Sequence, residues 1–189
     1  KPKLGVFYDN SNMFYAHKKA GWKMDFEKLK AELSGSFEVK FINLYAAIPE
    51  EGDPSREGTL HYLDSIKENI TLKTKLLKYI EIARGKYEKK GDMDVDIILD
   101  VVRTIHEVDV VMIVSGDSDF FPLKDYILRD NGKKIVFAGF ENSMAWELRQ
   151  IKHLYLNRYK KDLIEVSGKK QAPSFGLGVV LYNSLYSSR

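Results

Sequence analysis

Short apolar runs of strand length alternate along this chain with segments whose apolar residues recur every three or four positions. The run Val-Val-Met-Ile-Val at residues 110–114 is unbroken and rich in β-branched side chains. Such a run is typical of a strand buried on both faces, as in a parallel sheet covered by helices. The pattern predicts strands at residues 4–8, 39–48, 72–83, 110–114, 134–138 and 154–156.

Segments of helical periodicity lie between these runs, at residues 13–20, 26–33, 56–69, 95–103, 120–129 and 143–151. In the segment 95–103, we expect Val95, Ile98, Leu99 and Val102 to pack on the sheet. Strands that alternate with helices are typical of an α/β fold. We therefore expect a Rossmann-like fold with a mostly parallel central sheet flanked by helices.

Two parts of the chain depart from this alternation. Lysines alternate with apolar residues at 72–83, which indicates one half-exposed strand at an edge of the sheet, and the basic segment 85–91 is expected to form a loop. After residue 166, glycine and serine become frequent. We expect one domain at residues 1–166 and a tail at 167–189, in which residues 179–182 could add a strand or contact a partner.

Composition narrows the class of protein. Of the 189 residues, 44% are hydrophobic and 30% are charged, as in a globular domain with its own core. No apolar run is long enough to cross a bilayer, and the first residues lack signal-peptide features. The absence of cysteine excludes disulfides and cysteine-bound zinc. These features favour a cytoplasmic protein without membrane contact, and a homo-oligomer stays open.

Acidic side chains directly follow two of the predicted strands. Asp9 ends the first strand, and Asp117 and Asp119 follow the fourth strand after Ser-Gly. Because α/β folds bind ligands at the carboxyl ends of parallel strands, we expect these acids to converge there, with Asp94 on the rim. Carboxylates so close repel one another unless a proton or a cation lies between them. Mg²⁺ and Mn²⁺ favour such oxygen ligands.

Each acid also has a purely local interpretation. Asp119 could cap the following helix, and Asp117 could belong to a turn. A carboxylate such as Asp94 is favoured at the start of a helix by capping and by the helix dipole. The joint pattern outweighs these interpretations because one sheet would bring all these positions to the same rim.

Basic residues crowd the middle of the chain. The net charge is only +3, so the location of the charge matters more than its total. A lysine-rich margin beside an acidic metal site would hold a phosphodiester backbone, although lysines also protect exposed sheet edges and solvated surfaces. The residues that we expect to contact RNA are Lys73, Lys75, Lys78, Arg84, Lys86, Lys89 and Lys90.

Aromatic and histidine side chains are less informative. Tyr15 and Trp22 follow the first acid closely and could stack on a base, but packing in the core is the favoured interpretation. The four histidines lack a spacing typical of metal ligands.

Three blocks of the sequence together resemble the signature of the NYN domain. They are Leu-Gly-Val-Phe-Tyr-Asp-Asn-Ser-Asn at 4–12, Lys-Gly-Asp-Met-Asp-Val at 90–95 and Val-Ser-Gly-Asp-Ser-Asp-Phe at 114–120. The NYN domain, with its LabA-like subgroup, belongs to the PIN-like nuclease superfamily. The resemblance implies a metal-dependent ribonuclease with a Rossmann-like sandwich. It also implies that Asp9, Asp94, Asp117 and Asp119 bind the metal, that Asn12 and Ser115 support them, and that Asp100 is a recurrent family acid.

Two departures from the family pattern stand out. Lys152 and His153 precede the last strand, where many relatives have an acid, and one extra residue separates Gly91 from Asp94, so Asp92 competes for that role. The leading hypothesis is a Mg²⁺- or Mn²⁺-dependent endoribonuclease that acts on single-stranded RNA. The alternative is an RNA-binding or regulatory module without turnover. A phosphatase or nucleotide hydrolase is less favoured, because no second acid follows Asp9 at the spacing of haloacid-type phosphatases.

Overall fold

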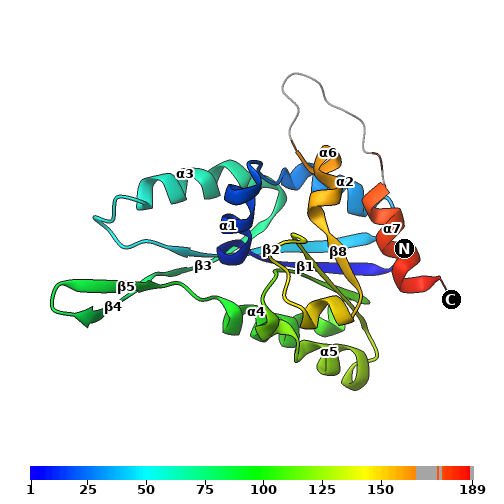
Figure 1. The fold of residues 1–189 in the computed structure, drawn as a ribbon. Coiled ribbons are helices and arrows are strands. Elements are labelled where there is room, and N and C mark those ends of the chain that lie inside the picture. The colour runs from blue at the N-terminus through cyan, green and yellow to red at the C-terminus, as the bar shows by residue number, and fades with distance from the viewer. Residues whose placement is uncertain (165–173, 175, 188–189) are drawn as a thin grey trace.

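A six-stranded sheet forms the centre of the molecule (Figure 1). The computed structural model describes residues 1–164, 174 and 176–187. The strand order is β3-β2-β1-β6-β7-β8, and every neighbouring pair is parallel. This confirms the predicted α/β fold and the adjacency of the first and fourth predicted strands. The strands are β1 (Lys3–Asp9), β2 (Glu38–Ile48), β3 (Thr71–Leu76), β6 (Val110–Val114), β7 (Lys134–Gly139) and β8 (His153–Tyr155).

Helices cover both faces of the sheet and enclose two apolar cores. Helices α1, α2, α3, α6 and α7 lie on one face, and α4 and α5 lie on the other (Figure 1). Neighbouring residues of β1 point to opposite cores, with Val6 in the first and Phe7 in the second. All residues of β6 are buried, as its unbroken apolar run predicts. The helices are α1 (Asn10–Ala20), α2 (Phe26–Ser34), α3 (Arg56–Ile66), α4 (Asp94–Thr104), α5 (Leu123–Asp125), α6 (Lys160–Leu163) and α7 (Gly176–Tyr186).

The buried face of α4 differs from the predicted one. Ile97 and Val101 are buried, whereas Val95, Leu99 and Val102 are 67%, 44% and 42% exposed. Polar contacts to the strands explain this rotation: Lys75 of β3 forms an ion pair with Asp96, and Tyr45 of β2 donates a hydrogen bond to Asp100. The prediction from the apolar residues alone was therefore wrong for Val95, Leu99 and Val102.

The lysine-rich middle of the chain forms two structures instead of one strand. β3 ends at Leu76, and residues 78–90 form a separate antiparallel hairpin of β4 (Lys78–Ala83) and β5 (Lys86–Lys90). Gly85 makes the turn with a φ of 75°, a conformation that glycine adopts readily. The single strand predicted at 72–83 and the loop predicted at 85–91 are both corrected by this hairpin, which projects away from the sheet (Figure 1).

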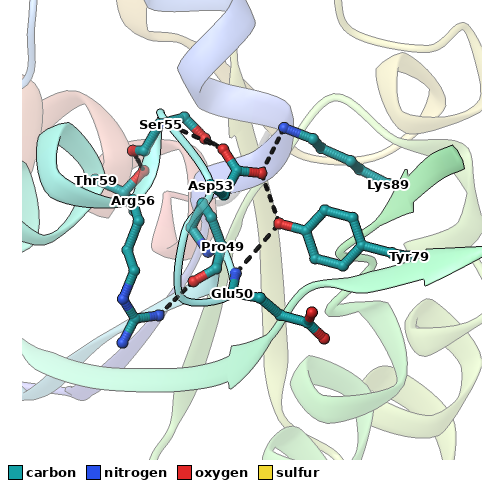
Figure 2. Close-up of polar contacts among 8 residues, drawn as sticks. All are labelled: Pro49, Glu50, Asp53, Ser55, Arg56, Thr59, Tyr79 and Lys89. Carbon is teal, nitrogen blue, oxygen red and sulfur yellow. Dashed lines mark hydrogen bonds and ion pairs between the residues drawn. The ribbon is translucent and has the colours of Figure 1, made fainter.

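One carboxylate fixes the hairpin to the loop after β2 (Figure 2). Asp53 accepts a hydrogen bond of 2.6 Å from the Tyr79 hydroxyl and forms an ion pair of 2.6 Å with Lys89. The other oxygen of Asp53 accepts hydrogen bonds from the backbone and the hydroxyl of Ser55. The pKa of Asp53 is lowered, first by the hydrogen bond from Lys89 and then by that from Tyr79. The hairpin is thus attached through a charged contact, in which the Asp53 side chain is largely covered and Lys89 is half exposed.

Replacing Asp53 by alanine should loosen the hairpin and leave the sheet intact. A two-stranded hairpin is marginally stable by itself in water, so loss of this contact should increase amide exchange at residues 78–90 several-fold. Hydrogen exchange followed by mass spectrometry measures this directly. The matched control is Asp64→Ala, which removes an exposed carboxylate that pairs with Lys67 in the same region. Equal exchange at 78–90 in both variants would contradict the anchoring role.

Three predicted elements near the end of the chain also differ. In place of one helix at 120–129 there are a 3₁₀ turn at Ser118–Phe120, the short helix α5 and a π-helical turn at Tyr126–Asp130. Pro122, which has no N–H to donate, separates the 3₁₀ turn from α5. Within 143–151 only Glu147–Gln150 is helical, since the Ala145 N–H is donated to Gly116.

The segment 179–182, for which a strand was suggested, belongs to helix α7, whose Leu177 and Leu181 are buried in the core. Gly178 allows α7 to approach α2 closely, because a β-carbon there would lie 2.4 Å from the Glu32 carbonyl oxygen. Of the predicted tail, the structure describes Ser174 and residues 176–187; residues 167–173, 175 and 188–189 lie outside the described residues. None of the helices in residues 1–164 and 176–187 has the length and apolar character that a membrane crossing requires.

Candidate metal centre

Asp9 joins the carboxyl ends of β1 and β6. It is the N-cap of α1, where one carboxylate oxygen accepts a hydrogen bond of 3.1 Å from the Asn12 N–H. The other oxygen accepts a hydrogen bond of 2.9 Å from the buried Ser115 hydroxyl. The Ser115 hydroxyl oxygen in turn accepts from the Asp117 N–H at 3.2 Å. This chain of bonds fixes the position of Asp9 relative to the loop after β6.

The loop after β6 also depends on Gly116. Its N–H donates to the Asn12 side-chain oxygen at 2.9 Å, which ties the loop to α1. A β-carbon at Gly116 would lie only 2.3 Å from the Ser143 carbonyl oxygen. Glycine is therefore required at this position by the close approach of two backbone segments, and this explains the Ser-Gly pair in the sequence.

Three carboxylates converge beside this loop. Asp94, in the first turn of α4, and Asp117 and Asp119, which follow β6, each offer an oxygen within 4.8 Å of the other two. Asp117 is held in place as the cap of the 3₁₀ turn, because it accepts a hydrogen bond of 2.9 Å from the Asp119 N–H. Asp94 is thus a full member of the group, whereas Asp9 lies deeper, among its hydrogen-bond donors.

Burial and negative charge shift the protonation of these acids. The pKa of Asp94 is raised to about 7, first by burial, then by a hydrogen bond with Asp92 and the charges of Asp92, Asp9 and Asp117. Burial also raises the pKa of Asp9, although hydrogen bonds from Asn12 and Ser115 oppose this. The site therefore carries more negative charge than its surroundings balance. A divalent cation with hard oxygen ligands, such as Mg²⁺ or Mn²⁺, fits this donor set.

The stability of the metal-free protein should depend on Asp94 between pH 4 and pH 7. Its folded pKa lies above the ordinary value of about 3.9, so the stabilising protonated form is fully present below pH 4 and is lost as pH rises through 7. The free energy of unfolding in EDTA should fall over this range. The slope should stay below the one-proton limit of about 1.4 kcal/mol per pH unit, because solvent screens this group.

The Asp94→Asn variant should remove most of this slope, and urea unfolding in EDTA at several pH values measures it. Asp130→Asn is a suitable control, because Asp130 is exposed and lies outside the acidic group. If the slopes of wild type and Asp94→Asn were equal, the raised pKa of Asp94 would be contradicted.

The structure places Asp100 outside the acidic group. Asp100 accepts a hydrogen bond of 2.8 Å from the Tyr45 hydroxyl and forms an ion pair of 3.5 Å with Lys73. Burial, followed by this hydrogen bond, raises the pKa of Tyr45, so its hydroxyl stays a donor. In this arrangement Asp100 fixes α4 to the edge of the sheet.

The predicted basic residues divide into two sets. Lys73, Lys75 and Lys89 form ion pairs with acids of the chain. Within residues 1–164, no ion pair involves the other four, which are Lys78, Arg84, Lys86 and Lys90.

The base of the hairpin lies within electrostatic reach of the acidic group. The pKa of Asp92 is lowered, first by its hydrogen bonds with Asp94 and, more weakly, by the charges of Lys75 and Lys90. Asp92, which competed with Asp94 in the sequence, instead accepts a hydrogen bond of 3.1 Å from the Asp94 N–H.

Sequence reasoning missed the role of Asp53. The segment Asp-Pro-Ser indicates a turn in which the Asp53 side chain bonds to Ser55, and this bond is present. The partners Tyr79 and Lys89 leave no local signal, because they lie on a hairpin that was predicted as part of a strand and a loop.

Comparison with known proteins gives the family. The chain is 27% identical over 157 residues to the Low amplitude and bright protein LabA of Synechococcus elongatus, and the match covers 82% of this chain and 83% of that protein. A crystal structure of a protein of unknown function from Vibrio parahaemolyticus superposes with a TM-score of 0.61 at 25% identity, covering 87% of this chain and 97% of that one. The NYN domain family matches residues 3–162. The chain therefore belongs to the NYN domain family, within the PIN-like nuclease superfamily.

Proposed function

We propose that this protein is a Mg²⁺- or Mn²⁺-dependent endoribonuclease that hydrolyses phosphodiester bonds of single-stranded RNA. The observation that carries the proposal is the convergence of Asp94, Asp117 and Asp119 at the carboxyl ends of the strands of an NYN domain. Three carboxylates within 4.8 Å are costly without a cation, and capping alone does not explain why two separate segments bring their acids together.

In this proposal Asp94, Asp117 and Asp119 hold the metal, and Asp9 adds charge from below. The bound metal would neutralise the phosphodiester and lower the pKa of the attacking water. Asp94, whose pKa is about 7 without metal, would have to be deprotonated to act as a ligand. Ser115 and Asn12 keep Asp9 and Gly116 in fixed positions, so the acids need little reorganisation when RNA binds.

The basic hairpin supports RNA as the substrate. Lys78, Lys86 and Lys90 lie on a projecting hairpin whose last strand leads within four residues to Asp94. Cationic side chains on such an arm can follow a phosphate backbone while the acidic group meets one phosphodiester. The hairpin and the acidic group are therefore adjacent in the sequence, and the charge of Lys90 reaches Asp92 beside Asp94.

The test is an incubation of labelled single-stranded RNA with EDTA, Mg²⁺ or Mn²⁺, with wild-type and Asp9→Asn protein in parallel. We expect cleavage only with metal and only by wild type, while RNA still binds in EDTA. RNA that is bound but left uncut with both metals and several unrelated sequences would instead assign the protein to the RNA-binding modules without turnover.

A further inference from the structure

A cavity of about 490 Å³ lies between α1, the segment after it and α3. This volume lies within the range of small-ligand sites. Phe14, Trp22, Tyr62 and Asn10 contribute to its lining, and of the three aromatic residues Trp22 is largely buried in the core. Phe14 is 50% exposed, an unusual state for a large apolar ring on a well-packed helix. The cavity therefore offers aromatic surface that the protein itself does not cover.

The floor of the cavity is uncharged. His17 is buried, and burial lowers its pKa to about 4, so it is neutral at pH 7. Its Nδ1 lies 3.0 Å from the Trp22 carbonyl oxygen and must donate to it, so Nε2 accepts from the Tyr8 hydroxyl at 2.9 Å. Both nitrogens of His17 are thus used, and this histidine has no hydrogen bond left for a ligand.

Besides the lysines Lys18 and Lys23, the polar side chains of the lining that remain for a ligand are the Asn10 amide and the Tyr62 hydroxyl. The hydroxyl lies 3.4 Å from the Asn10 side-chain oxygen, a long and weak hydrogen bond that a ligand can replace. Burial raises the pKa of Tyr62 to about 12, so the hydroxyl stays protonated. An amide and a hydroxyl beside aromatic rings match the edges and the faces of a nucleobase.

We propose that this cavity binds an unpaired nucleobase of the RNA whose backbone lies at the acidic group, an inference that rests on the proposed function. Asn10 lines the cavity and directly follows Asp9, which caps α1 and is hydrogen-bonded to Ser115 at the start of the loop that carries Asp117 and Asp119. Lys18 and Lys23 also line the cavity and would attract the phosphates of a nucleotide. These lysines favour a nucleotide over an apolar peptide side chain, which would bring no negative charge.

Binding can be measured without cleavage through the fluorescence of Trp22. In a Trp146→Phe background, which removes the exposed second tryptophan, Trp22 is the single tryptophan. The four nucleoside 5′-monophosphates and ribose 5-phosphate are titrated in EDTA. We expect a saturable change of fluorescence with at least one nucleotide, and at least about fivefold weaker binding of ribose 5-phosphate, because base stacking contributes roughly 1–3 kcal/mol.

Two variants on neighbouring positions of α1 form a matched pair. Phe14→Ala should weaken nucleotide binding about 5- to 50-fold, since it removes a stacking face. Tyr15→Ala should leave it unchanged, because Tyr15 is 72% exposed and does not line the cavity. Tyr62→Phe keeps the ring but removes the hydroxyl, so it should change the preference among the four bases. Circular dichroism spectra confirm that each variant is folded.

Several outcomes would overturn the proposal. These are binding of ribose 5-phosphate as tight as that of the nucleotides, equal effects of Phe14→Ala and Tyr15→Ala, and absence of any saturable nucleotide binding. The outcome is separable from that of the nuclease proposal. Asp117→Asn, which should not cleave RNA, should still bind nucleotides as wild type does. Nucleotide binding by a wild-type protein that cleaves no RNA would remove only the nuclease proposal. Metal-dependent cleavage with no base binding would remove only the cavity proposal.

Discussion

Replacing Asp117 by asparagine should abolish metal-dependent RNA cleavage and weaken Mn²⁺ binding more than about 100-fold. Loss of a residue that only orients a metal ligand typically weakens metal binding by about 10- to 100-fold. Asp117 is one of three converging carboxylates and also caps the turn that carries Asp119. Asparagine keeps an oxygen for the cap, so the fold should survive. In EDTA the variant should be as stable as wild type or more stable, because one repelling charge is gone.

Cleavage assays, calorimetric Mn²⁺ titration and thermal unfolding in EDTA measure these three effects. Asp125→Asn is the matched control, because Asp125 is an exposed acid in the helical segment that follows the same loop and pairs with Arg129. It should behave like wild type in all three measurements. Normal cleavage by Asp117→Asn would show that the acidic group has only a structural role, as part of a turn and as a helix cap.

Neutralising Lys78, Lys86 and Lys90 together should weaken RNA binding about 100-fold at 0.1 M salt. Each phosphate contact on single-stranded RNA contributes about 0.7 to the slope of log K against log salt, so the slope should fall by about 2. These lysines form no ion pair within residues 1–164, so their loss should not disturb the fold. Fluorescence anisotropy of a labelled RNA in EDTA at several salt concentrations measures both quantities.

The control for this experiment carries the same change of net charge elsewhere. Lys30, Lys40 and Lys160 are exposed and lie on α2, β2 and α6, away from the hairpin. Their replacement by glutamine should leave the salt slope nearly unchanged. Equal losses in the two triple variants would show that only total charge matters, and the hairpin lysines would then be ordinary surface residues.

The elements that the sequence predicts well are those whose signals are local. The apolar run of β6 has few alternatives to a buried central strand, and Asp25 caps α2 as its position before Phe26 indicates. The α4 helix itself was also predictable. Its orientation was not, because Lys75 and Tyr45, which bind its acids, lie far away in the sequence.

The same division holds for the candidate site. Asp9, Asp117 and Asp119 could be placed near one another because parallel strands end at one edge of the sheet. The depth of Asp9 and the close approach of Asp94 depend on side-chain bonds to Ser115 and Asp92, which no periodicity encodes. Within the hairpin, β4 was predicted as part of a longer strand, and β5 was missed because its exposed sequence lacks the apolar alternation that identifies half-buried strands.

If Asp94, Asp117 and Asp119 bind a cation as proposed, their convergence would also link the lifetime of the protein to its supply of metal. Asp94 comes from a different segment than Asp117 and Asp119, so the three acids can meet only in the folded chain. A cation that binds there stabilises the native state by mass action, by about 2.7 kcal/mol at a free concentration of 100 times Kd. Metal depletion would raise the fraction of unfolded molecules accordingly, so proteolysis would remove the inactive protein faster than the loaded one.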